Sequence, residues 1–298
     1  MGSFAKKQLR ASLTLPQGNF AGAGNTLVLD GLRMSARLTG AGNYTNQCDL
    51  RIFGMKQADM NSLTVLWGQG GNPQNVNAKA ILVLESNDGS GWLQVFEGQF
   101  FDAQPDYKAL PDVNLSITCM SGYGAQIITT KPSSFQGSVD AATVASQLAG
   151  QMGFAFENNG VKGTLNTPYY AGTAMDQFRD LARDAKFDYY FDAKQTLCIC
   201  PQNQPRKGKN AVVISPTSGL IGYVSLTRYG GVELDCLFSP AIELGSPIQI
   251  QNSDVPGTNG LWFPFKFAFD LEAVKPGGRW QAHLECLPNP GVAGPGSS

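Results

Sequence analysis

The sequence is poor in the residues that enzymes use most often for catalysis. It contains one histidine in 298 residues, and charged residues make up only 15% of the chain. Hydrolases with a serine or cysteine nucleophile need a base within hydrogen-bond reach of that nucleophile. The one imidazole, His283, alternates with apolar residues, which predicts a surface side chain on the polar face of a strand. Motifs of serine-hydrolase elbows, phosphate-binding loops and zinc-protease helices are also missing.

Long hydrophobic segments are missing as well. The longest apolar runs, such as residues 80–84, have the length of a strand and are too short to span a bilayer. The first 13 residues contain no apolar stretch of the signal-peptide kind, so we expect no secretion signal and no membrane segment. With 22 basic and 23 acidic residues, the chain does not have the charge of a nucleic-acid-binding protein. After residue 211, four basic residues stand against seven acidic ones.

The cysteines fit neither a disulfide framework nor a zinc site. Structural zinc sites usually need closely spaced cysteine pairs or additional histidines. Four of the six cysteines lie in alternating strand-like runs, namely Cys48, Cys119, Cys236 and Cys286. The other two, Cys198 and Cys200, share one face of a predicted strand. We therefore expect reduced cysteines that act as small buried side chains.

Residues 138–201 contain the two convincing helices of the sequence. For the first helix, Ser138 or Asp140 is the expected N-cap, and Gly153 is the expected stop because glycine readily adopts the left-handed conformation. Its apolar residues recur at helical spacing and form one stripe, made of Ala141, Val144, Ala145, Leu148 and Met152.

The second helix is expected to begin at Thr173, with Asp176 completing a capping-box-like pair. Its predicted inner face consists of Ala174, Phe178, Leu181, Ala182 and Ala185. The opposite face carries opposite charges at i,i+3 and i,i+4 spacing, from Asp176, Arg179, Asp180, Arg183 and Asp184. This pattern predicts a solvated surface.

Each helix precedes a predicted hairpin. In the first, residues 154–156 and 161–165 flank an Asn-Asn-Gly turn, and in the second, residues 187–191 and 196–200 flank a turn at 192–195. The region is therefore expected to consist of two consecutive helix-hairpin units. Together they would form a small α+β insertion with two helices on one face of a sheet.

The flanking regions are rich in turns and alternate like strands, with 35 glycines and 17 prolines in the whole chain. A short helix is expected near residues 57–66, with Met60, Leu63 and Leu66 on its inner face. The predicted fold is mainly β, with two barrel-like domains flanking the α+β unit. The expected divisions are residues 1–136, 137–210 and 211–288, followed by a flexible tail at 289–298.

Two alternatives to a structural role remain open. Glycosidases use paired carboxylates, and the candidates are Asp102 with Asp106 and Asp188 with Asp192. A tryptophan pair, Trp262 and Trp280, is the candidate platform for sugar stacking. Acids at strand ends and tryptophans in β-domains are more often structural, so both alternatives rank below a protein without catalytic chemistry.

The order and spacing of several segments across residues 4–287 resemble the baseplate hub proteins of tailed bacteriophages. The resemblance begins with FAKKQLRASLTL, NTLVLDGLRMSARLTGAG and DLRIFGMKQADMNSL. It continues with FEGQFFDAQPDY, PDVNLSITC and KPSSFQGSVDAATVASQLAGQMGFAFENNGV. PYYAGTAMDQFRDLARDAKFDYYFD and SPTSGLIGYVSL complete it. It implies two tube domains with an α+β insertion, in a homotrimer whose six tube domains form a ring.

The resemblance also implies a function. The expected protein is a structural hub of the phage tail that joins the tail tube or distal tail proteins to the central spike and surrounds part of the DNA channel. It implies no catalytic residue, no cofactor and no metal, contacts with other baseplate proteins, and a place in a virion assembled in the host cytoplasm. Related hubs serve phage-like contractile injection devices, which are an alternative. A wall-degrading hydrolase and a glycan-binding module are the other two.

Overall fold

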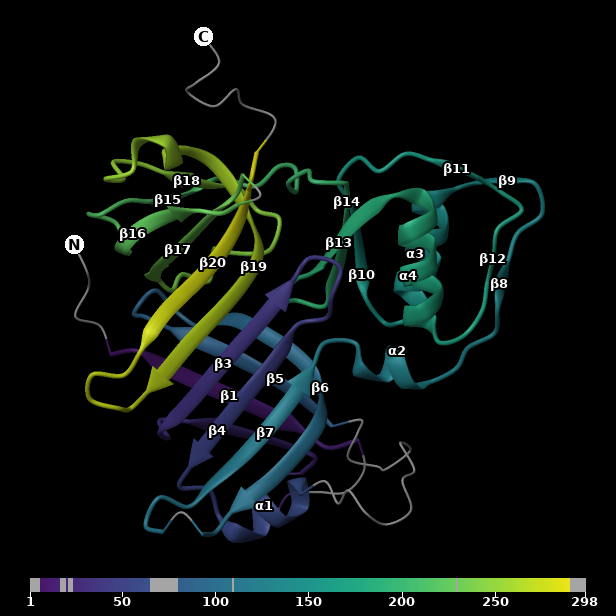
Figure 1. Ribbon diagram of the computed structural model, residues 1–298. Coiled ribbons are helices and arrows are strands. Elements are labelled where there is room, and N and C mark those ends of the chain that lie inside the picture. The colour runs from purple at the N-terminus through teal and green to yellow at the C-terminus, as the bar shows by residue number, and fades with distance from the viewer. Residues whose placement is uncertain are drawn as a thin grey trace. The chain divides into compact units, whose positions relative to one another are not determined.

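The computed structural model describes residues 6–16, 20, 24–64, 80–108, 110–228 and 230–289 (Figure 1). The chain forms two compact units. Unit 1 comprises residues 1–39, 46–127 and 269–280, and unit 2 comprises residues 40–45, 128–268 and 281–298. With 48% strand and 15% helix, the fold is mainly β, as the sequence predicts.

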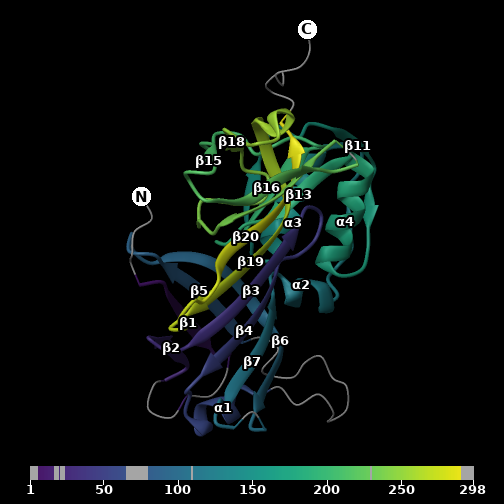
Figure 2. The same cartoon turned by 60° about the vertical axis from the view of Figure 1, so that its left-hand side comes forward.

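Unit 1 is built on an antiparallel sheet with the strand order β3-β4-β7-β6-β5-β1-β2. The strands are β1 (Gln8–Thr14), β2 (Thr26–Asp30), β3 (Met34–Ala41), β4 (Gln47–Phe53), β5 (Ile81–Asn87), β6 (Leu93–Asp106) and β7 (Asn114–Met120). Figure 2 shows β1 and β2 next to each other at one margin of this sheet. The last two residues of β3 belong to unit 2.

The core of unit 1 follows from the period of two along its strands. In β1 and β3, every second side chain is buried and its neighbours are half-buried or exposed. The paired strands β4 and β7 bring Cys48 opposite Cys119 in this core, and all six cysteines of the chain are buried and free. Burial raises the pKa of both of these thiols well above its usual value, so they act as apolar side chains.

The short helix predicted in unit 1 is present as α1 (Gln57–Leu63), with Met60 and Leu63 buried. Leu66, which the sequence places on the same face, lies outside the described residues, as do residues 290–298 of the predicted tail. A second short helix, α2 (Tyr123–Ile127), follows β7.

Unit 2 contains the two long helices, α3 (Ala141–Gln151) and α4 (Ala174–Ala185). Asp140 caps α3 by accepting a hydrogen bond from the backbone of Thr143, and Gly153 follows the helix with φ of 82°. Thr173 and Asp176 form the predicted capping box of α4. The predicted stripes are buried, except that Met152 and Ala185 at the two C-terminal ends are only half-buried.

The helices pack on a three-stranded sheet ordered β10-β14-β13, formed by β10 (Ala155–Asn158), β13 (Phe187–Phe191) and β14 (Thr196–Pro201). Phe178 of α4 meets Phe187 and Tyr189 of β13 edge to face, with ring centroids 5.9 and 5.1 Å apart. In Figure 1, α3 and α4 stand beside these strands. The α+β insertion is thus one helix pair on one small sheet.

The second predicted hairpin is confirmed, because β13 and β14 pair antiparallel around the turn at 192–195. The pairing predicted for the first hairpin is wrong. The Asn158 side chain does form a turn by accepting hydrogen bonds from Gly160 and Val161, but β10 then pairs in parallel with β14. The following strand, β11 (Thr164–Asn166), pairs instead with β9 (Ser138–Asp140). The predicted turn is therefore present, but the strand that pairs with β10 is β14, which lies further along the chain.

Strands β16 (Leu220–Leu226), β17 (Val232–Leu237) and β20 (Trp280–Pro288) pair antiparallel in that order, and β19 (Gly260–Ala273) is the strand next to β20. Strand β15 (Val212–Ile214) pairs in parallel with β18 (Ile248–Ile250), which pairs with β19. Residues 269–273 of β19 and Trp280 of β20 belong to unit 1. Two short strands, β8 (Ser133–Ser134) and β12 (Tyr169–Tyr170), pair with each other, and a 3-10 turn, η2, covers Pro256–Thr258.

Candidate functional site

The carboxylates singled out in unit 1 lie at the end of β6. Asp102 accepts a hydrogen bond from the Gln104 amide at 3.3 Å, and Asp106 accepts one from the backbone of Lys108 at 3.0 Å. Asp106 is exposed and closes a turn.

The other two carboxylates, in unit 2, hold backbone segments in place. Asp188 is buried and accepts hydrogen bonds from the Asn43 amide at 2.9 Å and from the backbone of Asn203 at 2.8 Å. Asp192 accepts from the backbone of Lys194 and of Thr196, both at 2.8 Å, which fixes the turn between β13 and β14. Both side chains therefore make structural hydrogen bonds that fix the surrounding backbone.

His283 lies on the polar face of β20, as the sequence predicts. Its Nδ1 is 2.9 Å from a carboxylate oxygen of Asp235, and its Nε2 is 3.4 Å from one of Glu233. Both acids project from the neighbouring strand β17, and no serine or cysteine takes part in these contacts. This arrangement is a surface cluster of polar side chains on paired strands.

Both candidate tryptophans are buried. The Trp262 indole donates a hydrogen bond to the Thr258 carbonyl at 2.8 Å, and Trp280 has the Lys7 ammonium 5.8 Å from its ring centroid. A sugar-stacking platform needs an exposed ring face, so these residues do not support the glycan-binding alternative.

Within the described ranges, no group of three His, Cys, Asp or Glu side chains is arranged to hold a metal ion. The helices described here include none that is both long and apolar enough to cross a membrane. An open groove of about 450 Å³ lies on unit 1 over the outer face of β3, β4 and β7. Its charged residues include both signs, and Asp270 pairs with Arg37 at 3.5 Å and with Arg279 at 3.9 Å. This mixture favours no single class of ligand.

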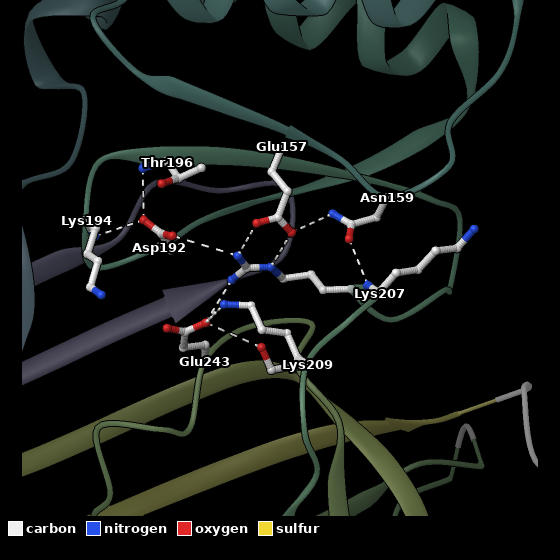
Figure 3. A network of polar contacts seen from close by, with 10 residues as sticks. Glu157, Asn159, Asp192, Lys194, Thr196, Lys207, Lys209 and Glu243 are labelled. Atoms are coloured by element: carbon white, nitrogen blue, oxygen red, sulfur yellow. Dashed lines mark hydrogen bonds and ion pairs between the residues drawn. The ribbon is translucent and has the colours of Figure 1, made fainter.

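A polar cluster in unit 2 is centred on Arg206, and Figure 3 labels its acidic partners Glu157, Asp192 and Glu243. The Arg206 side chain is only 1% exposed and forms a two-pronged pair with Glu157 at 3.0 and 2.6 Å. The same guanidinium contacts Glu243 at 3.0 Å and Asp192 at 3.8 Å. Planar guanidinium groups suit such multiple carboxylate contacts better than a lysine ammonium does.

The cluster connects three segments of unit 2 that are distant in sequence. Glu157 belongs to β10 of the small sheet, Asp192 to the β13–β14 turn, and Glu243 to the loop before β18. The Arg206 backbone N–H also donates to the Gly245 carbonyl at 2.7 Å, in the same loop as Glu243. Arg206 therefore ties the α+β insertion to the loop that precedes β18.

The electrostatics of the cluster follow from this geometry. The hydrogen bonds from Arg206 lower the pKa of Glu157 from 4.5 to about 2, against the effect of its partial burial. Burial disfavours the charged form of Arg206, but the hydrogen bonds to Glu157 and the negative charges of Glu157 and Glu243 together outweigh it and raise the pKa of the guanidinium above its usual value. Both groups are thus charged at neutral pH.

We expect this pair to make unfolding pH-dependent in acid. The folded-state pKa of Glu157 is depressed, so its contribution to stability is complete above about pH 4.5 and declines as the pH falls towards 2. Wild-type protein should therefore lose more stability than Glu157→Gln across this window, as measured by urea unfolding at each pH. Two parallel stability curves would contradict the assignment of Glu157 as the group that titrates.

A second cluster, around Asn43, holds the β3–β4 turn within unit 2. Asn43 has a φ of 67°, and its backbone N–H donates to the Tyr189 carbonyl at 2.9 Å. Its side chain accepts from the Tyr189 backbone at 3.0 Å and donates to Asp188. The adjacent Gly42 has room for no side chain, because a Cβ there would lie 2.5 Å from the Phe265 ring. Structural bonding, rather than chemistry, explains why Asp188 is buried.

Sequence reasoning missed the Arg206 cluster. Arg206 lies in a polar, proline-containing segment that resembles an exposed loop, and its two closest acidic partners, Glu243 and Glu157, are 37 and 49 residues away. The only local signal was an arginine among lysines, which predicts a solvated surface.

The comparisons with known proteins agree with a β-rich tail protein. Residues 8–276 match the family model described as "Baseplate hub gp41". The fold resembles the 43 kDa tail protein of prophage MuSo2 from Shewanella oneidensis, with a TM-score of 0.63 and 11% identity over 95% of this chain and 96% of that one. No curated protein matches the chain in sequence.

Two further solved structures have the same fold. The tail protein from Neisseria meningitidis MC58 has a TM-score of 0.63 and 8% identity, over 94% of this chain and 96% of that one. The E. coli c3393 protein, a component of the type VI secretion system, has a TM-score of 0.61 and 8% identity, over 93% of this chain and 76% of that one. At these identities the likeness concerns the fold alone.

Proposed function

Because the chain belongs to the Baseplate hub gp41 family, we propose that it is the hub that joins a phage tail tube to the central cell-puncturing spike. The observation that carries this proposal is the family match across residues 8–276, which includes both units of the chain. The family establishes a structural role in the tail baseplate. The proposal adds the position between tube and spike and a share of the DNA channel.

The proposed assembly is a homotrimer. In this proposal, residues 1–136 and 211–288 are two tube domains and residues 137–210 are the α+β insertion between them. Three chains then supply six β-rich blocks, which match a six-fold tube on one side and a three-fold spike on the other. Tube or distal tail proteins, the spike and other baseplate proteins are the proposed partners.

A passive role in genome ejection is consistent with the charge of the chain. Beyond residue 211, seven acidic residues stand against four basic ones. Glu233, Asp235 and Glu285 project from β17 and β20, where Glu233 and Glu285 are register partners. DNA that passes an acidic wall is not retained by clustered positive charge. The proposed location is the virion, after assembly in the host cytoplasm.

The proposal includes no enzymatic activity. Its support is that the candidate acids Asp188 and Asp192 are occupied by backbone hydrogen bonds and that His283 pairs with two acids. Release of peptidoglycan fragments by the purified chain, abolished by an Asp188→Asn change that leaves folding intact, would contradict this part of the proposal.

A hub of a phage-like contractile injection device is the second candidate. The fold it shares with the E. coli type VI secretion component favours it. The two candidates differ in cargo, because a virion contains DNA above the hub and an injection device does not. Particles purified with this chain and tested for nuclease-protected DNA distinguish them.

We expect purified chain to form a trimer, alone or together with its spike protein. Native mass spectrometry of the chain with and without the spike measures this directly. Three copies per spike trimer are the expected result. A chain that stays monomeric in the presence of its spike contradicts the proposed hub assembly.

A further inference from the structure

A buried glutamine of α4, Gln177, bonds to the segment that precedes α3. Its side chain is fully buried, and its carbonyl oxygen accepts hydrogen bonds from the Ser133 backbone at 3.1 Å and from the Ser133 hydroxyl at 2.7 Å. Its amide nitrogen donates to the Thr130 hydroxyl at 3.0 Å, the Lys131 carbonyl at 3.2 Å and the Gly172 carbonyl at 3.3 Å. The hydrogen-bonding capacity of this amide is therefore used within unit 2.

The segment bound to Gln177, residues 128–137, buries none of its own side chains. Its half-buried residues are Thr130, Ser133 and Phe135, and all the others are exposed. The helices α3 and α4, in contrast, have buried inner faces. Segments with few buried apolar contacts open at a lower free energy than the core of a protein. Residues 128–137 are therefore expected to open before the helix pair unfolds.

Backbone hydrogen bonds also hold this segment. It lies antiparallel to residues 167–173, and Figure 1 shows β8 and β12, at the centre of the two stretches, side by side. The Thr130 N–H donates to the Gly172 carbonyl at 3.3 Å, and the Phe135 N–H donates to the Pro168 carbonyl at 3.2 Å. Between these two bonds, the Ser133 N–H donates to the Gln177 side chain. A side chain of α4 thus bonds to the middle of an exposed ribbon.

We propose that residues 128–137 form a strap that opens as a unit while the helix pair stays folded, and that Gln177 is the latch that holds the strap closed. When the strap opens, water replaces it around the Gln177 amide, so no buried polar group loses its partner. When the strap is closed over an apolar side chain, in contrast, the Ser133 N–H and the Lys131 carbonyl lose the partner that Gln177 supplies, which is unfavourable.

The position of the strap in the chain gives its opening a consequence. The strap begins directly after Ile127, where one segment of unit 1 ends. Its opening therefore changes the course of one connection of the chain without unfolding α3 or α4. This device concerns the chain by itself and does not depend on the hub assignment.

Hydrogen exchange of the full chain at low urea concentrations tests whether the strap opens separately. The amides of Thr130, Ser133 and Phe135 are expected to exchange at least about tenfold faster than those in the centre of α3 and α4. Their exchange should depend little on urea, because opening of the strap exposes little surface. The same rate and the same urea dependence for strap and helices would mean that they unfold together, which overturns the proposal.

Two substitutions test the latch. Gln177→Met keeps the length of the side chain but removes its bonds to the strap, so exchange of the strap amides should become about tenfold faster or more. Ser133→Ala removes one of these bonds from the strap side without changing α4, and it should give a smaller increase at the same amides. Gln147→Met, on the exposed face of α3, is the control and should change neither the strap nor the helices.

The outcomes separate a latch from a general loss of stability. If strap exchange stays at the wild-type rate in both Gln177→Met and Ser133→Ala, Gln177 is not the latch. If the helix amides accelerate as much as the strap amides in both variants, these bonds stabilise unit 2 as a whole and the proposal is wrong. Should Gln177→Met fail to fold, Ser133→Ala decides between these results. The position of the chain in particles bears on the hub assignment alone.

Discussion

Replacing Arg206 with methionine is expected to destabilise unit 2 by about 3–5 kcal/mol. The change removes one buried positive charge from the three carboxylates of Glu157, Asp192 and Glu243. Lys209, which also contacts Glu243, remains as the only other cation that contacts these acids in the described part of the cluster. Methionine has a similar length and fills the site, so most of the loss is electrostatic. Equilibrium unfolding in urea measures it.

A matched control is available on the surface of α4. Arg183 forms an ion pair with Asp180 one helical turn away, and its side chain is 74% exposed. Exposed pairs of this kind contribute about 0–1 kcal/mol, so Arg183→Met should have a small effect. If Arg206→Met unfolds at the same urea concentration as Arg183→Met, the Arg206 cluster does not hold unit 2 together.

Truncation of the helix core is the second large effect. Leu148→Ala in α3 and Phe178→Ala in α4 are each expected to cost about 2–5 kcal/mol, because both side chains are fully buried and leave a cavity. Phe178 also loses its edge-to-face contacts with Phe187 and Tyr189. The free energy of unfolding from denaturant titration is the quantity to compare.

The neighbouring Gln147 supplies the control for this prediction. Gln147 is exposed on the same helix, so Gln147→Ala should change stability by about 0.5 kcal/mol or less. Loss of stability in all three variants alike would mean that helix formation, and not packing of the predicted faces, is the limiting factor. A wild-type melting profile for Leu148→Ala would mean that the assigned faces are wrong.

The sequence predicted the parts of the fold that depend on local signals. The α4 cap is an example, because Thr173 and Asp176 are three residues apart and bond to each other's backbone. The alternating strands of unit 1 are another, since burial at every second residue fixes their two faces. The turn at Asn158 was equally local and was also predicted.

The same local signals do not predict which strands or charged side chains pair when they are far apart in the sequence. After Asn158 the chain could return as a hairpin, and only the tertiary fold shows that β10 pairs with β14, whose residues are 41 positions away in register. The Arg206 cluster has the same character, because its acids come from three separate segments. In the folded chain Arg206 is buried and pairs with acids from these three segments, although each of these residues is of a type that usually lies on the surface.

Electron cryomicroscopy of intact particles locates this chain directly. We expect density for three copies between the end of the tail tube and the spike, with the two β-rich units of each copy forming a ring around the central channel. Density for this chain on the outer baseplate, on the fibres or in the spike tip alone would contradict it.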